Sequence, residues 1–370
     1  MRKNMNAAES SLKIPVITLV VAVGFTFFVG GISGLLALAL VFALLFFVGG
    51  WDSAAKHGIS EDYSCRLGGV ILVAYPACAL FFQWFSGNKL EFSQTGILLA
   101  VMSLGIFALG LYEDLTSVLS ARRRLVLMLS GISLLVFAVP ELVVMPLGIP
   151  FVDWLLSQPI AAYPLTVLAL AFLPNAFNVA DGANGLLSGV SLFALYGLME
   201  LMPDIHIWPL EVLFTGCLIF FALNVLTGRL FLGDGGAYLL GLLVGISLIL
   251  VANQTAVSPW FLAMLIFYPT TDFLFSMIRR VIAGRSAMSA DNEHFHNLVY
   301  RTIKLSGLRP VIANTLTGVS VASLWSGGAV LLKINYDGTV NWVIVYLCSW
   351  CIFIVLWLLL KQVVRQEPAI

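Results

Sequence analysis

Long apolar runs, separated by short polar stretches, follow one another along almost the whole chain. A helix needs roughly 20 apolar residues to cross a bilayer, and about 17 is the lower limit. The runs are Ile14–Gly30, Ile32–Gly49, Leu67–Phe85, Thr95–Leu111, Leu125–Val139, Ala161–Phe177, Leu186–Met202, Leu210–Leu226, Gly236–Val251, Pro259–Ile278, Val311–Leu332 and Trp342–Leu360. This pattern predicts an all-α, polytopic integral membrane bundle of about 11–12 transmembrane helices, forming a single domain over residues 1–370.

The first two runs are joined by Gly30-Gly31-Ile32-Ser33-Gly34, and they form either a tight hairpin or one long, tilted helix. Lys and Arg decide the orientation, because they are retained on the cytoplasmic side. With twelve spans, all 19 Lys and Arg except Lys89 and Lys333 fall on one side. With eleven spans, the three basic residues before the first run would cross over. The distribution therefore favours the hairpin, an uncleaved and cytoplasmic N-terminus, and cytoplasmic polar loops.

The composition excludes several classes of protein. The chain is 60% hydrophobic and 10% charged, its mean hydropathy is +1.01, and its net charge is zero, so no basic surface indicates nucleic acid. The five cysteines are scattered and do not form a disulfide framework. Cys348 and Cys351 form a CxxC pattern, but they lie inside the last apolar run and are interpreted as packing residues.

A pair of carboxylates, Glu113 and Asp114, ends the fourth apolar run. Adjacent carboxylates beside hydrocarbon repel one another unless a cation lies near them, and Mg²⁺ or arginine can supply it. The basic stretch Arg122 to Arg124 follows at the membrane surface, where a lipid phosphate would be met. The alternative is a salt-bridged interfacial cap.

A denser polar motif runs from Pro174 to Gly185 and contains Asn178, Asp181 and Asn184. Irregular backbone at membrane depth is tolerated only around a cavity or a buried site. Asn178 and Asp181 are three residues apart, so one helical turn would bring their oxygens to the same face. Oxygen ligands of this kind suit a hard divalent cation.

The segment Phe231-Leu-Gly233-Asp234-Gly-Gly opens another apolar run. An acid among glycines at the start of a helix is typical of a metal or phosphate corner. Phe231 could offer a face on which a base stacks, and ordinary packing is the alternative for it.

Two further loops carry candidate groups. Asp291-Asn-Glu-His294-Phe-His296-Asn297 lies in the most basic loop, where His294 and His296 could bind diphosphate or exchange protons near neutral pH. Arg66, followed by Gly68 and Gly69, could hold a phosphate, or it could be an ordinary cytoplasmic arginine. Asp272 lies seven residues before Arg279, and a structural ion pair between them is expected.

Taken together, these segments resemble the polyprenyl-phosphate N-acetylhexosamine-1-phosphate transferases, the WecA/MraY-like members of glycosyltransferase family 4. The resemblance covers about residues 50 to 310 and follows the family order of motifs, with the segments around Asp181 and Asp234 the most specific. It is closer to the WecA-like branch, because the basic spacing that MraY carries after its acidic pair is missing.

The resemblance implies transfer of an N-acetylhexosamine 1-phosphate from a UDP-sugar to undecaprenyl phosphate, with release of UMP, at the bacterial inner membrane as the first step of an O-antigen-like glycan. It implies Mg²⁺, with Mn²⁺ as an alternative. Matched motif by motif, the site residues fall into three groups. The catalytic group is Glu113, Asp114, Asp181, His294 and His296; the substrate-binding group is Arg66, Arg124, Asn184 and Phe231; the metal ligands are Asn178 and Asp234. Glu113 stands where the family has Asp, and Asn297 stands where it has the last His.

Other readings stay open at this point. A secondary transporter would also carry membrane acids, although those are expected near the midplane on broken helices rather than in loops at one interface. A CDP-alcohol phosphotransferase shares only the Asp181-Gly182 dipeptide. The identity of the UDP-N-acetylhexosamine and the oligomeric state, a homodimer included, cannot be read from the sequence.

Overall fold

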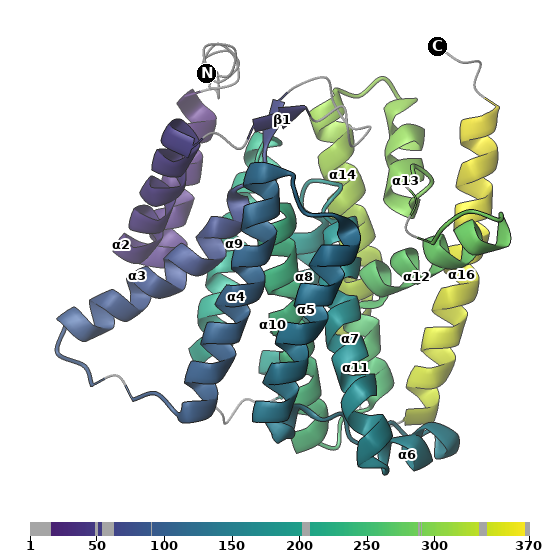
Figure 1. Ribbon diagram of the computed structural model, residues 1–370. Helices are drawn as coiled ribbons and strands as arrows, with labels where there is room; N and C mark the ends of the chain where they lie inside the picture. Colours follow the sequence, from purple (N-terminus) through teal and green to yellow (C-terminus); the bar gives the residue numbers. More distant parts are fainter. Residues whose placement is uncertain are drawn as a thin grey trace.

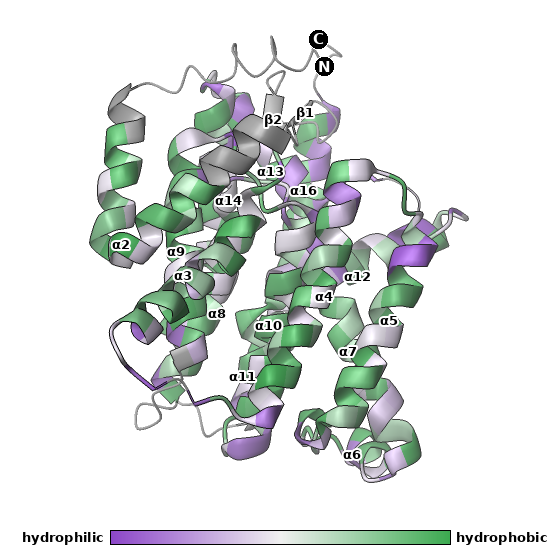
Figure 2. Ribbon diagram, turned by 60° about the vertical axis from the view of Figure 1, so that its left-hand side comes forward, coloured by the Kyte–Doolittle hydropathy of each residue, from purple (hydrophilic) through white to green (hydrophobic). Residues whose placement is uncertain are grey.

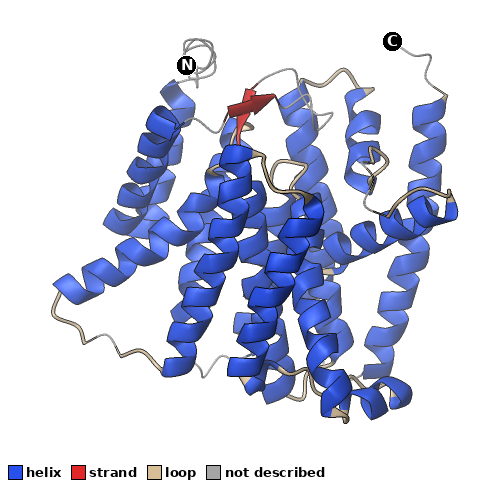
Figure 3. Cartoon of the chain, viewed as in Figure 1, coloured by secondary structure: helices blue, strands red, loops and turns tan. Residues whose placement is uncertain are grey.

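A computed structural model of the chain describes residues 16–48, 51–53, 63–89, 91–201, 208–287, 289, 291–332 and 339–366. Several of the basic residues used to predict the orientation lie outside these ranges: Arg2, Lys3, Lys13, Lys56 and Lys333. The fold is a bundle of helices, most of them running roughly parallel to one axis (Figures 1 and 3). The elements are α2 (Val16–Val48), β1 (Trp51–Ser53), β2 (Tyr63–Cys65), η2 (Gly68–Val70), α3 (Ile71–Phe85), α4 (Gln94–Thr116), α5 (Ala121–Ala138), η3 (Pro140–Leu142), α6 (Pro150–Leu156), α7 (Pro159–Ala180), α8 (Leu186–Leu201), α9 (Trp208–Thr227), α10 (Gly233–Gln254), α11 (Pro259–Leu265), α12 (Phe267–Ile282), α13 (Phe295–Lys304), α14 (Pro310–Ala322), η4 (Ser323–Gly327), α15 (Gly328–Leu331) and α16 (Thr339–Arg365).

The helical membrane fold predicted from the apolar runs is confirmed. Among the described residues, seven helices are long and apolar enough to cross a membrane, and the pair α11–α12, bent by 81°, makes up to eight. Figure 2 shows hydrophobic residues along most of their lengths. Large apolar side chains such as Phe28 and Phe137 are 87% and 80% exposed, which is expected of a surface that faces lipid rather than water.

The count of seven or eight is lower than the predicted 11–12 because α2, which contains most of the first two apolar runs, is counted once, and because several other runs form shorter or more polar helices. Helix α5 begins with three arginines, helix α8 has 16 residues, and α14 has 13 before the chain continues as η4 and α15. These segments are helical as predicted, but they do not meet the criteria of length and composition by themselves.

The first two apolar runs form a helical hairpin. Gly31 has non-helical backbone angles (φ 56°, ψ −148°) in the middle of α2. A β-carbon added at Gly34 would lie only 2.8 Å from the carbonyl oxygen of Thr26. Residues eight apart in a continuous helix are about 12 Å apart along the axis. The chain therefore reverses at Gly31, which confirms the hairpin.

Helix α10 is the centre of the bundle. It packs most extensively against α4 and α7. In its most apolar stretch of 18 residues, 72% is buried inside the protein, compared with 17% in the corresponding stretch of α16. Aliphatic side chains of α10 contribute to both large core clusters, including Leu240 to one and Leu242 to the other. Helix α10 is therefore held chiefly between α4 and α7, and the candidate site is built around its N-terminal end.

Candidate active site

Asp114, near the end of α4, caps the N-terminus of α10. Its Oδ1 accepts a hydrogen bond from the backbone N–H of Asp234 at 2.9 Å, and its Oδ2 accepts one from Gly235 at 3.0 Å. The first N–H groups of a helix have no partner within the helix, and they carry the positive end of its dipole. A carboxylate from α4 thus satisfies two of these donors, and the two helices are joined at the site.

Asp181, which follows α7, binds the same turn from another side. Its Oδ2 accepts a hydrogen bond from the backbone N–H of Gly233 at 3.1 Å. Removal from water raises the pKa of Asp181 well above its ordinary value; the Gly233 N–H opposes this shift, and the nearby charge of Asp114 adds to it. The motifs predicted around Asp114, Asp181 and Asp234 therefore meet in one place.

Gly233 permits this close approach. Its φ is +71°, and a β-carbon at this position would lie 2.1 Å from the carbonyl oxygen of Arg66 and 2.6 Å from Oδ2 of Asp114. Only glycine combines this backbone conformation with such proximity. Glycine is therefore sterically required at position 233, directly before Asp234.

The Asp234 side chain is bound on both oxygens. Its Oδ1 accepts a hydrogen bond from Nδ2 of Asn178 at 2.7 Å, and its Oδ2 forms an ion pair with Nη1 of Arg124. The hydroxyl of Tyr238 lies 3.2 Å from the same arginine nitrogen. The two residues predicted as metal ligands, Asn178 and Asp234, are therefore in direct contact, with Arg124 as the cation beside them.

No ready-made metal cage is present in the described part of the chain, since no three His, Cys, Asp or Glu side chains are grouped as metal ligands there. The local donors are nevertheless hard oxygens. Three carboxylates, those of Asp114, Asp181 and Asp234, surround one helix end, and Arg124 and Arg66 are the cations that interact with them.

Arg66 reaches the site through a backbone ladder. Cys65 donates its N–H to the carbonyl of Arg229 and accepts from the N–H of Phe231 at 2.7 Å, and Gly68 donates to the carbonyl of Phe231 at 2.9 Å. The segment that contains Arg66 and its paired glycines therefore runs beside the segment that leads into Asp234. Two motifs more than 150 residues apart in sequence form one strip of backbone.

Glu113 takes a different direction from its neighbour. Its Oε2 accepts a hydrogen bond from the backbone N–H of Leu119 at 2.8 Å, within the loop that joins α4 to α5. Arg122 and Arg123 are exposed at the start of α5, whereas Arg124 is half-buried against Asp234. Of the acidic pair, only Asp114 contacts the turn at Asp234.

Asn184 and Phe231, two of the residues predicted to bind substrate, are joined through a third residue. Asn224, buried on α9, accepts a hydrogen bond from the N–H of Gly185 and donates Nδ2 to the carbonyl of Leu230 at 2.6 Å. It therefore connects the turn of Asn184 to the segment of Phe231. The Oδ1 of Asn184 is buried without a partner, while its Nδ2 lies 3.4 Å from the hydroxyl of Thr315. An unsatisfied buried acceptor of this kind is a candidate for ligand binding.

The histidine loop contacts the Asp181 motif. A β-carbon at Gly182 would lie 2.4 Å from Nε2 of His296, so the imidazole is directly against this turn. The ring of His294 is parallel to that of His296, with centroids 5.7 Å apart. The structure thus brings the histidine loop against the polar motif that runs from Pro174 to Gly185.

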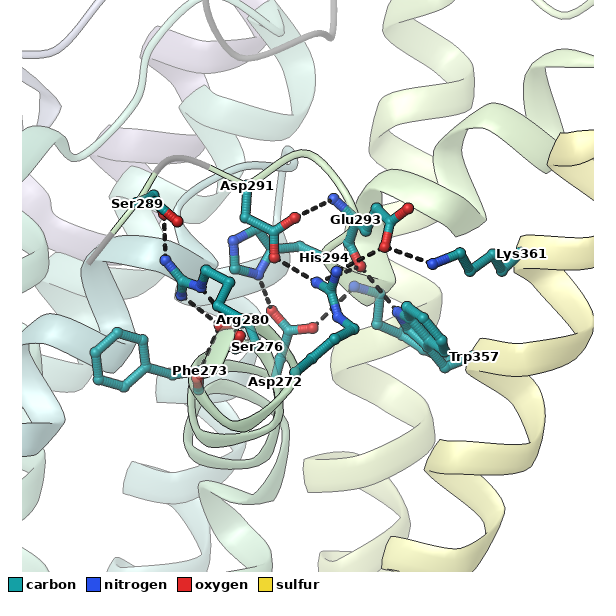
Figure 4. A network of polar contacts seen from close by, with 12 residues as sticks. Asp272, Phe273, Ser276, Arg280, Ser289, Asp291, Glu293, His294, Trp357 and Lys361 are labelled. Carbon is teal, nitrogen blue, oxygen red and sulfur yellow. Dashed lines mark hydrogen bonds and ion pairs between the residues drawn. The ribbon is translucent and has the colours of Figure 1, made fainter. Parts of the chain in front are cut away.

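The expected ion pair between Asp272 and Arg279 is wrong. Asp272 binds Nδ1 of His294 at 2.7 Å instead (Figure 4). Arg279 forms ion pairs with Asp291 and with Glu293. The loop after α12 turns back over that helix, and its acids Asp291 and Glu293 therefore pair with Arg279 in place of Asp272.

A basic cavity of about 430 Å³ lies beside this network. It is lined by Arg279, Arg280, Ala283, Arg285, Asp291, Asn292, Glu293 and Lys361. Lys361 of α16 pairs with Glu293 at 2.7 Å, and the Trp357 indole donates to the backbone carbonyl of Glu293 at 2.8 Å (Figure 4). Helix α16 thereby fixes the loop that carries the histidines.

Three residues of the site were not singled out from the sequence. Asn224, Tyr268 and Asn314 are isolated polar residues within apolar helices, and each makes a buried hydrogen bond to a motif. A lone amide or hydroxyl in a helix core usually needs a partner, which is the signal that could have identified them.

The comparisons with known proteins agree with this geometry. Residues 96–252 match the model of glycosyl transferase family 4. This match, called the family 4 segment below, covers less than half of the chain. The predicted resemblance is therefore confirmed, and the family 4 segment contains Asp114, Asp181 and Asp234.

Curated relatives are similar over 36% to 55% of this chain. An undecaprenyl-phosphate alpha-N-acetylglucosaminyl 1-phosphate transferase of Escherichia coli (strain K12) is 31% identical over 206 residues, which is 52% of this chain and 55% of the relative. Its namesake from Yersinia pestis is 30% identical over 220 residues, 55% of this chain and 58% of the relative. A decaprenyl-phosphate N-acetylglucosaminephosphotransferase of Mycobacterium leprae (strain TN) is 31% identical over 158 residues, 36% of this chain and 40% of the relative. The chain spans about half the length of the first relatives it matches. Outside the family 4 segment lie Arg66, His294 and His296.

Proposed function

We propose that the protein transfers an N-acetylhexosamine 1-phosphate from a UDP-sugar to undecaprenyl phosphate, releasing UMP, and so starts a lipid-linked cell-surface glycan. The observation that carries the proposal is the convergence of Asp114, Asp181 and Asp234 on the first turn of α10. Three carboxylates at one helix start suit a hard divalent cation, and such a cation holds the phosphates of a nucleotide substrate. The activities after which the bacterial relatives are named support the same chemistry.

The donor set fits a divalent metal ion. Mg²⁺ is usually held by one or two carboxylates together with substrate phosphates rather than by a cage made only of protein. Asp234 and Asn178 would supply oxygens to it, and Arg124 now provides the positive charge at Asp234. The bound ion would neutralise the diphosphate and the charge that develops on the leaving group.

The transfer itself requires two anions to meet in line. An oxygen of the lipid phosphate forms a bond to the β-phosphorus of the UDP-sugar. The bond from that phosphorus to the bridging oxygen breaks, and its electron pair leaves with UMP. We assign Asp114 to orienting the acceptor or keeping it deprotonated, since its carboxylate retains lone pairs beyond the two backbone bonds.

The route can be distinguished from covalent catalysis. Direct attack predicts no UMP release from the UDP-sugar when the lipid phosphate is absent. A stoichiometric burst of UMP without acceptor would instead indicate an aspartyl-phosphate intermediate.

The polar site lies at the edge of the bundle that carries β1 and α13, opposite α6 (Figure 1). The arginines of this edge, including Arg122, Arg123 and Arg285, match the positive-inside pattern. We therefore infer that the site faces the cytoplasm and that the protein belongs to the bacterial inner membrane.

The decisive experiment incubates purified protein with a panel of UDP-N-acetylhexosamines, polyprenyl phosphate and Mg²⁺ or Mn²⁺, and identifies the lipid product by mass. The expected result is a polyprenyl diphosphate sugar and an equal amount of UMP, both abolished by EDTA. Uptake of a substrate into proteoliposomes without chemical conversion would refute the proposal and support a transporter.

A further inference from the structure

Helix α12 contributes two buried polar side chains to the histidine loop. Tyr268 and Asp272 are four residues apart, so they lie on the same face of the helix, and their exposures are 0% and 2%. Each contacts one histidine, and each also contacts the backbone beside it. Buried polar groups are costly unless they are fully satisfied, so these contacts restrict where the protons lie.

Asp272 determines which nitrogen of His294 is left for a ligand. Its Oδ2 lies 2.7 Å from Nδ1 of His294, and its Oδ1 accepts the N–H of Phe295 at 2.8 Å. An ionised carboxylate only accepts hydrogen bonds, so Nδ1 of His294 carries a proton. The nitrogen left for a ligand is therefore Nε2.

The surroundings of His294 favour its charged form. Burial alone would lower the pKa of His294, but Asp272 outweighs it and raises the pKa, and Asp291 acts in the same direction. The Arg280 charge opposes them, and the ring of His296 is stacked in parallel. Two carboxylates against one guanidinium therefore favour the imidazolium form of His294 over the neutral form.

Tyr268 determines the tautomer of His296 in a different way. Its hydroxyl oxygen accepts the backbone N–H of His296 at 3.2 Å and lies 2.6 Å from Nδ1 of the same residue. If Nδ1 carried the proton, the buried hydroxyl would have no acceptor in this pair of contacts. The satisfied arrangement has Tyr268 donating to Nδ1, so that the neutral ring carries its proton on Nε2. That nitrogen is the one directed against Gly182.

We propose that Tyr268 and Asp272 are positioning residues that set the two histidines in complementary states. His294 is a cation with Nε2–H available, and His296 is a neutral donor through Nε2–H at the turn that follows Asp181. The charged His294 then presents its Nε2–H to an anionic diphosphate, while the buried His296 directs its Nε2–H at the turn beside Gly182. The inference deepens the proposed function and rests on it for the identity of the ligand.

The protonation states can be measured without any substrate. The chain has four histidines, two of them in the pair, so ¹⁵N-histidine labelling gives few signals, and His294→Gln and His296→Gln assign them. In the wild type, His294 is expected to titrate above the ordinary range and His296 to show the Nε2–H tautomer. In Asp272→Asn the midpoint of His294 moves to lower pH, and Asp272→Glu restores it in part. An unchanged midpoint in Asp272→Asn, or the opposite tautomer at His296, would overturn the proposal.

Measurements of turnover then test whether these protonation states affect binding of the UDP-sugar. The imidazolium exists below its pKa, so binding of the UDP-sugar weakens as pH rises through that value. Asp272→Asn is expected to raise KM for the UDP-sugar about tenfold, with less effect on kcat, and to move the alkaline limb of the pH profile to lower pH. Asp272→Glu should retain the wild-type limb more closely. A role confined to capping α13 predicts an equal loss at every pH, and this outcome contradicts the proposal.

Matched controls lie at the other end of the bundle. Asp153→Asn removes a carboxylate that accepts the N–H of Leu147 at 2.6 Å, and Tyr163→Phe removes a hydroxyl outside the site. Both should keep the wild-type profile; a similar shift in them would contradict a specific role of Asp272. If the wild type converts no UDP-sugar, the proposed function fails, while the labelled histidines still decide their own states.

Discussion

Replacing Asp114 with Asn tests whether this carboxylate anchors α10. The side chain now accepts two backbone N–H groups, those of Asp234 and Gly235. An Asn of the same shape has one oxygen and one NH₂ group. Whichever way it turns, the NH₂ group meets a backbone donor, so one hydrogen bond is lost and one N–H is left unsatisfied.

The magnitude follows from these contacts. A hydrogen bond to a charged group contributes about 1.5–3 kcal/mol, and an unsatisfied buried N–H costs about 1–3 kcal/mol. Neutralising Asp114 also removes its repulsion with Asp234 and its attraction to Arg66, and these two effects oppose each other. We therefore expect Asp114→Asn to lower the free energy of unfolding by about 2–4 kcal/mol.

The neighbouring acid provides the control. Glu113 accepts a single N–H, from Leu119 in an exposed loop, and the amide oxygen of Gln can still accept it. Glu113→Gln should change the free energy of unfolding by less than about 1 kcal/mol. Unfolding of both variants in detergent can be followed by the fluorescence of the nine tryptophans during denaturation with SDS. Equal stability of the two variants would refute the capping role of Asp114.

Three other outcomes are expected. Asp181→Asn and Asp234→Asn should each abolish UMP formation while the protein stays folded in the membrane; near-normal turnover of both in detergent with Mg²⁺ would remove the metal-site assignment. Gly182→Ala should reduce turnover by about tenfold or more, because the β-carbon meets an imidazole at 2.4 Å, whereas Gly24→Ala, with nothing within 4 Å, should not. Withdrawal from water would raise the pKa of Asp291, but the Glu293 N–H and the Arg279 charge outweigh it and lower the pKa. The ionised Asp291 therefore stabilises the fold above the ordinary Asp pKa, and this stabilisation is lost as pH falls through the lowered pKa. Asp291→Asn should accordingly flatten the acid limb of the curve of unfolding free energy against pH.

The sequence predicts the centre of the site well, because polar residues in an apolar chain are informative. Asp234 lies among glycines at the start of a long apolar run, and Asn178 lies in an interrupted one. Both patterns indicate helix ends, and helix ends on the same side of a bundle gather at one level. The contact between Asn178 and Asp234, 56 residues apart, follows from this argument.

The pairing of Asp272 could not be predicted in the same way. Helical periodicity places Arg279 near the face of Asp272, two turns further along α12. The loop from Ala283 onward has no periodicity, and its path decides which acids reach the arginine. Because that loop folds back, Asp291 and Glu293 pair with Arg279, and His294 becomes the partner of Asp272.

The number of membrane spans could also not be predicted from the hydropathy pattern alone. A run such as Leu125–Val139 is apolar, but the helix that contains it starts at Ala121 and includes three arginines. Whether such a helix crosses the membrane depends on where its charged end lies. Here Arg124 is turned toward Asp234, so its charge is satisfied inside the protein.

The two halves of the site are built by the same device. Asp114 of α4 accepts the first N–H groups of α10, and Asp272 of α12 accepts the N–H of Phe295, the first residue of α13. In both cases a carboxylate from one helix caps the start of another, where free donors and the helix dipole favour negative charge. The side chains beside those starts, Asp234 in one and His294 in the other, are thereby held on rigid elements rather than on loops. Under the proposed function, a diphosphate would be met by a cation held at Asp234 and by the imidazole of His294, while the N–H groups of the two helix starts stay satisfied by Asp114 and Asp272.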